Sequence, residues 1–194
     1  MAIAFRSCRP RRTLARSLAA LAVLGASSLA AAPLPPPAAW CEALLPVAAI
    51  PAALGRPVPG LARRTILAVP ENDRQCARRY AIGNNPFGDE LIVRVTPARD
   101  ASGARGTLQR LRREAERGRV FGLSSPEGLG AGAVHFRRPD PLADHRMAFV
   151  VAFARGAHVV ELTYHNVDNG KSDTFIQASA ELEPIARGLL ERWP

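Results

Sequence analysis

The sequence lacks the short motifs that mark many enzyme active sites. Its 194 residues contain no Gly-x-Ser-x-Gly nucleophile elbow, no phosphate-binding glycine loop and no His-Glu-x-x-His pair. Asp168-Asn169-Gly170 has the composition of a calcium loop, but it lacks the alternating acids and the closing glutamate. We interpret it as a turn. These absences favour a protein that is not an enzyme and that holds no metal and no cofactor.

Lysine is also scarce, since Lys171 is the only lysine beside twenty-five arginines. We attribute this bias to a GC-rich genome, so an arginine by itself is weak evidence for an anion site. The formal net charge is +9, but residues 1–30 hold five arginines and no acid, and their removal leaves +4. A surplus of this size does not require an anionic partner, and we expect no nucleic acid among the partners.

No apolar run reaches the roughly 20 residues that a membrane-spanning helix needs. Five arginines precede a short apolar core at residues 18–24, and small residues follow it. These are the three regions of a secretory signal peptide. We therefore expect residues 1–30 to be a signal peptide cleaved near Ala30. The protein would then be bacterial, exported by the secretory or the twin-arginine route, periplasmic or secreted, and without a stable membrane span.

The rest of the chain reads as one folded unit behind a short spacer. Residues 31–39 are rich in proline, which favours an extended linker. Residues 40–194 have the length of one domain with a single core.

Cysteine is nearly absent from that domain. Cys8 leaves with the signal peptide, so Cys41 and Cys76 remain. An isolated pair in an oxidising compartment predicts one disulfide. A disulfide that closes the loop between Cys41 and Cys76 would stabilise the folded state by about 4 kcal/mol in the chain-entropy model. A redox role is less favoured, because the two cysteines do not have Cys-x-x-Cys spacing.

Apolar periodicity predicts an α+β fold, an antiparallel sheet of about four to six strands packed against two or three helices. The expected helices are a broken one at 41–54, an amphipathic one at 107–117 and a C-terminal one that ends near residue 193. The expected strands are 65–69, 77–82, 90–96, 133–138 and a hairpin of 146–154 with 157–165.

The hairpin is the best-defined of these elements. With Arg155-Gly156 as its two-residue turn, Ala154 lies opposite Ala157. All the large apolar side chains of the hairpin then fall on one face, which we expect to meet the helices. The other face is lighter and carries Glu161 and Thr163.

One weak constellation of polar residues is a candidate ligand site. If their strands are neighbours, Arg94, Glu161 and His135 would project from the lighter face of the sheet and form a polar pocket. The simpler interpretation is that Arg94 and Glu161 form a cross-strand ion pair on a partly solvated face.

The order of elements resembles that of the small exported α/β domains of the DUF3558 type, most of which have no known function. The resemblance rests on a cysteine that opens a helix, on Leu-Gly-x-Pro-Val at Leu54–Val58, on a second cysteine before a strand and on the Gly-Leu-Gly turn at 128–130. It carries over no catalytic residue.

Three functions remain open at this point. The first is an exported, non-enzymatic accessory or binding domain, whose partner would be an envelope protein or a small ligand. The second is an extracytoplasmic ligand-binding or sensor protein that uses the lighter sheet face. The third is a hydrolase of unrecognised type that uses the loop Asp140–His145, with Asp144 and His145 as the residues to test.

Overall fold

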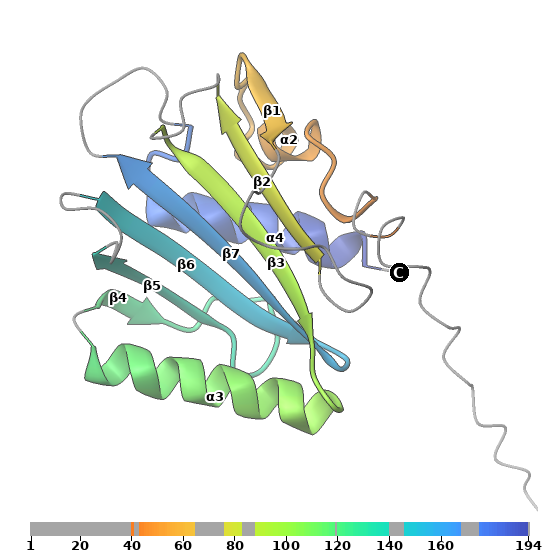
Figure 1. Ribbon diagram of the computed structural model, residues 1–194, viewed down its shortest axis with the longest axis vertical. Coiled ribbons are helices and arrows are strands. Elements are labelled where there is room, and N and C mark those ends of the chain that lie inside the picture. The colour runs from red at the N-terminus through yellow and green to blue at the C-terminus, as the bar shows by residue number, and fades with distance from the viewer. Residues whose placement is uncertain are drawn as a thin grey trace, which may run out of the picture. The chain divides into compact units, whose positions relative to one another are not determined.

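A single antiparallel sheet organises the chain (Figure 1). The computed structural model describes residues 40, 43–64, 76–82, 88–118, 120–139, 146–167 and 175–193. All of them belong to one unit, Pro33–Pro194. In chain order the elements are α2 (Ala49–Leu54), β1 (Leu61–Arg64), β2 (Cys76–Ile82), β3 (Glu90–Pro97), α3 (Ala101–Arg117), β4 (Phe121–Ser124), β5 (Val134–Pro139), β6 (Arg146–Arg155), β7 (His158–Val167), a 3-10 turn (Ser179–Glu181) and α4 (Leu182–Glu191).

The sheet has seven strands in the order β1-β2-β3-β7-β6-β5-β4, and each neighbouring pair is antiparallel. The antiparallel α+β class is therefore confirmed, whereas the expected four to six strands are too few. The edge strands β1 and β4 have four residues each, which is too short for alternation to be recognised in the sequence. The strand expected at 65–69 lies outside the described residues.

The β6–β7 hairpin forms with a register two residues away from the one we expected. Arg155 pairs with His158, and Phe149 pairs with Tyr164. The two central turn residues are thus Gly156 and Ala157, and Gly156 has a φ of 54°. The primed turns of tight hairpins require positive φ at their first central position, which glycine adopts without strain. A shift of two residues preserves the faces, so the prediction of one heavy face holds.

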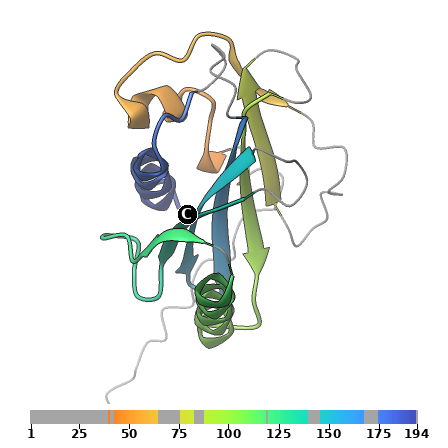
Figure 2. The same ribbon diagram turned by 90° about the vertical axis from the view of Figure 1, so that its left-hand side faces the viewer.

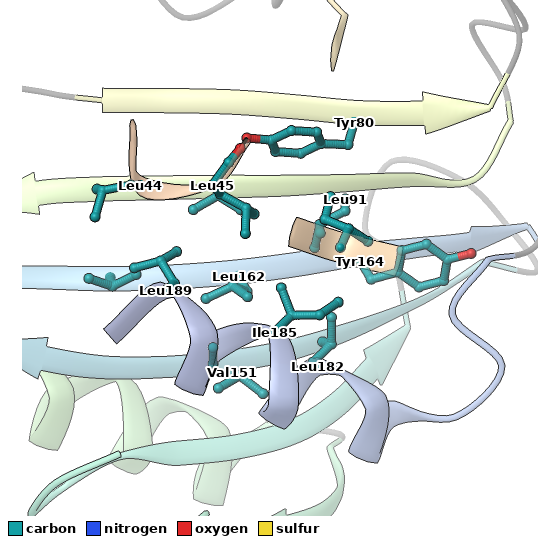
Figure 3. Packing of buried hydrophobic residues seen from close by; sticks show 14 of the residues in the cluster. Leu44, Leu45, Tyr80, Leu91, Val151, Leu162, Tyr164, Leu182, Ile185 and Leu189 are labelled. Atoms are coloured by element: carbon teal, nitrogen blue, oxygen red, sulfur yellow. Dashed lines mark hydrogen bonds between the residues drawn. The ribbon is translucent and has the colours of Figure 1, made fainter. Parts of the chain in front are cut away.

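That heavy face carries the larger core, against α4 and α2 (Figure 3). From α4, Leu182, Ile185 and Leu189 point toward Val151 and Leu162 of the hairpin. All five side chains are fully buried. Full burial of such a side chain is worth about 1.5–3 kcal/mol, so this contact fixes the C-terminal helix on the sheet.

The helix α3 covers part of the opposite, lighter face. Its Ala104 and Leu108 pack with Val150 and Phe136 in a second, smaller cluster. The helix begins six residues earlier than we expected, because the Asp100 side chain caps it by accepting a hydrogen bond from the Gly103 N–H at 2.7 Å. Figure 2 shows α2 and α4 together on one side of the sheet and α3 apart from them.

The glycine-rich loop before β5 also contributes to the larger core. Leu129 is 1% exposed although it lies in a turn region. Its neighbours Gly128 and Gly130 both have positive φ, of 77° and 90°. The loop therefore folds inward at this point and supplies Leu129 as a core side chain.

The expected signal peptide, residues 1–30, and the expected spacer, residues 31–39, lie outside the described residues. Within the described ranges, no helix is long and apolar enough to cross a membrane.

Candidate functional site

Arg94 and Glu161 are cross-strand neighbours, because β3 pairs with β7 and places these two residues directly opposite each other. Arg94 is exposed and Glu161 is partly buried. Glu161 accepts a hydrogen bond from the Thr163 hydroxyl at 3.0 Å. This part of the expected site is thus an open strip of sheet surface.

His135 lies on the other face and cannot join that pair. It is opposite Val151 in β6, which pairs in turn with Leu162, and both belong to the heavy face. Its Nδ1 is 2.9 Å from Glu183 Oε1 of α4, and its side chain is 8% exposed. Directly paired residues of an antiparallel sheet share a face. The structure therefore does not form the expected trio, and His135 links β5 to the C-terminal helix.

Cys76 is disulfide-bonded and buried at the start of β2. Cys41, the partner that the sequence predicts for it, lies outside the described residues, so this pairing stays a prediction. Asp144 and His145, the residues of the hydrolase hypothesis, also lie outside them. Among the described residues, no three metal-ligating side chains come together.

The structure contains a hollow that the sequence did not predict, between the second half of α3 and β5. Its volume is about 350 Å³, at the lower end of the range for small-ligand pockets. The walls are mainly apolar, and two charged residues, Glu114 and Arg138, line it as well. The apolar lining includes Leu111, Ala115, Val120 and Phe136.

The elements place these side chains for simple geometric reasons. Phe136 and Arg138 are two residues apart on β5, so both project from the lighter face of the sheet. Leu111 and Ala115 are four residues apart on α3, so they share one side of the helix. The helix crosses this face over β5, β6 and β7. The hollow remains where α3 ends and the chain turns toward Val120.

Arg138 is the polar group of particular interest here. Within the described part of the chain, its Nε is buried and has no hydrogen-bond partner. An unpaired buried donor costs about 1–3 kcal/mol. Glu114 is different, because its side chain is 63% exposed and lies 3.9 Å from Arg110. The hollow thus combines apolar walls, an arginine donor without a partner among the described residues and an acid at the solvent side.

Comparison with known proteins identifies the fold and goes no further. No family model and no curated protein matches this sequence. Among solved structures, the chain is similar to the extracellular domain of PknH from Mycobacterium tuberculosis, with a TM-score of 0.54. That similarity covers 78% of this chain and 93% of that chain, at 9% sequence identity. The two chains share a fold, and the resemblance to the DUF3558 type stays a prediction.

Proposed function

We propose that this chain is an exported bacterial domain that is not an enzyme and that acts as an accessory or binding module. The fold shared with the extracellular domain of PknH is the observation that carries this proposal. Two further features support it. Residues 1–30 have the composition of a signal peptide, and Cys76 is disulfide-bonded, which suits an oxidising compartment.

A small ligand is the partner that the geometry favours over an envelope protein. The hollow between α3 and β5 is bounded on two sides and mainly apolar, as small-molecule sites are. The strip around Arg94 and Glu161, by contrast, is an open strand surface. We therefore move the candidate site from that strip to the hollow.

Native mass spectrometry tests the proposal. The protein is expressed in a bacterial host with its own N-terminus and purified without reductant from the periplasm and the medium. We expect a chain that begins near residue 31 and lacks the two hydrogens of one disulfide. A Cys76→Ser variant serves as the control, because it cannot form this disulfide. A chain that keeps residues 1–30 and stays in the cytoplasm would contradict the proposal.

The same experiment separates the two kinds of partner. A reproducible small-molecule adduct would identify a binding module for a small ligand. Co-purification of one envelope protein with a bare domain would instead identify an accessory role. A hydrolytic activity that disappears in an Asp144→Ala/His145→Ala double variant would contradict the non-enzymatic assignment.

A further inference from the structure

We propose that the hollow between α3 and β5 binds a small organic monoanion, a carboxylate on an apolar body, with the carboxylate on Arg138. This inference rests on the proposed binding function and gives it a ligand class. It starts from the apolar walls of the hollow, where Phe136 and Leu111 provide contact area for an aromatic or branched aliphatic group.

The charged end of the ligand follows from Arg138. Its Nε–H is buried without a partner among the described residues, and native proteins leave few such donors unsatisfied. A guanidinium presents its donors in a planar fork that matches the two oxygens of a carboxylate. Because this Nε is closed to water in the structure, the guanidinium turns toward the hollow on binding, and a carboxylate that accepts from Nε and from one terminal nitrogen then satisfies the orphaned donor.

A comparison with other buried nitrogens identifies what is particular to Arg138. The Nε of Arg64 and the Nε2 of His135 are also buried without a partner in the described ranges. Neither Arg64 nor His135 lines the hollow. Of these three residues, Arg138 alone both has an unsatisfied donor among the described residues and lines the hollow.

The acid at the hollow limits the charge of the ligand. Glu114 repels anions, and its exposed contact with Arg110, at 3.9 Å, offsets this only in part. A single negative charge close to Arg138 is tolerated, whereas inorganic phosphate, with up to two charges and no apolar body, is disfavoured. Glu114 acts against an anion much more than against a neutral ligand. Tighter binding of an anion than of its neutral counterpart would therefore have to come from Arg138.

The experiment is a binding titration of the purified, disulfide-intact mature domain by two-dimensional amide NMR. Benzoate is the probe, benzamide is its neutral counterpart of the same shape, and inorganic phosphate is the anion without an apolar body. We expect saturable binding of benzoate with a Kd of about a millimolar or below. Benzamide and phosphate should bind at least about tenfold more weakly. The shifted amides should lie in the second half of α3 and in β5.

Two variants and one matched control locate the site. Arg138→Gln removes the charge and should weaken benzoate binding by about tenfold or more. Arg137→Gln removes the same charge from the adjacent residue, which is exposed and projects from the opposite face, and it should leave the Kd unchanged. Val120→Phe should fill the hollow and abolish binding while Arg138 stays in place. The amide spectrum of each variant reports whether it is folded.

Equal affinity for benzoate and benzamide would overturn the inference, and so would equal losses in Arg138→Gln and Arg137→Gln. Absence of any saturable benzoate binding by a folded, exported, disulfide-bonded domain would overturn the ligand class alone. The proposed function would then stand. A chain that is not exported would overturn the proposed function whatever the titration gives.

Discussion

The Tyr164 hydroxyl donates a hydrogen bond of 2.6 Å to Asp89 Oδ2 inside the protein. The same hydroxyl accepts from the backbone N–H groups of Phe175, at 3.2 Å, and Ile176, at 3.3 Å. One side chain of β7 thereby holds the residue before β3 and the segment that leads to α4. Asp89 is 3% exposed, so the pair is isolated from water.

Replacing Tyr164 with phenylalanine should therefore be costly. The variant leaves a buried carboxyl group and two N–H groups without this hydroxyl, and we expect a loss of about 1.5–3 kcal/mol in the free energy of unfolding. Tyr80→Phe is the comparison, because it removes the hydrogen bond of 2.5 Å to the Leu45 carbonyl and should cost about 1 kcal/mol. Urea denaturation measures both values. Equal losses would contradict this account of Tyr164.

Alkaline pH should act on the same group. Burial, together with the hydrogen bond to Asp89, raises the pKa of Tyr164 far above its usual value. The folded state thus holds this proton more tightly than the unfolded state does. Its contribution to stability is complete below the unfolded pKa of about 10 and is lost as the pH rises beyond it. In a spectrophotometric tyrosine titration, Tyr164 should ionise only as the chain unfolds. A reversible ionisation of Tyr164 near pH 10 in the folded protein would refute this.

Acid should weaken the bond between the loop after α2 and the 3-10 turn. Glu181 Oε1 lies 2.6 Å from Arg56 Nη1, and Oε2 accepts from Nη2 at 2.9 Å. The hydrogen bonds from Arg56 lower the pKa of Glu181. Their stabilisation is present above the unfolded pKa of about 4.3 and is lost as the pH falls through the folded value.

A Glu181→Gln variant should consequently lose about 1 kcal/mol at neutral pH and nothing at acid pH. Thermal melts at a series of pH values measure the difference. Glu114→Gln is the control, since that side chain is 63% exposed and 3.9 Å from its arginine. A loss at Glu181 that does not depend on pH would count against the pair.

Mildly acidic pH should act on His158. Its ring forms a cluster of three with those of Trp40 and Trp193, at centroid distances of 6.0 Å and 5.5 Å, and the two indole rings are 5.6 Å apart. Burial lowers the pKa of His158. Stability should therefore fall as the pH drops below the unfolded value of about 6.5, because the unfolded chain takes up the proton first. His158→Phe should flatten this part of the stability curve. A pKa of 6.5 or above for His158, measured by NMR, would contradict the prediction.

Leu129 should behave as a core residue despite its place in a loop. We expect Leu129→Ala to cost about 2–5 kcal/mol, because the side chain is 1% exposed. Phe121→Ala is the control, since Phe121 is 52% exposed and its truncation should change stability by less than about 0.5 kcal/mol. Chemical denaturation compares them, and a small loss at Leu129 would mean that the loop does not anchor there.

The sequence predicted correctly the features that follow directly from the alternation of large apolar residues. Large apolar residues alternate along β6 and β7, so the two faces could be assigned even though the register was two residues off. The register depends on whether Gly156 is the first or the second turn residue. That choice is a matter of backbone geometry, and alternation does not report it.

The candidate site could not be predicted in the same way. Val134 and Phe136 bracket His135 and fix its face relative to theirs, but β5 alone does not say which helix covers which face. The hollow depends on how far α3 extends over β5, and these elements meet through tertiary packing. No local signal at Arg138 distinguishes it from the other arginines of the sequence.

The pairing of β3 with β7 has a consequence for how this chain reaches its folded state. Glu90 is opposite His165, 75 residues further along the chain. Pairings of such long separation slow folding and leave an unpaired strand edge in the meantime. While the polypeptide is being made, β3 can pair with β2 at once, but its other edge has no partner until β7 emerges, and α4 follows later still. The larger core of the protein can therefore close only after α4 has been made.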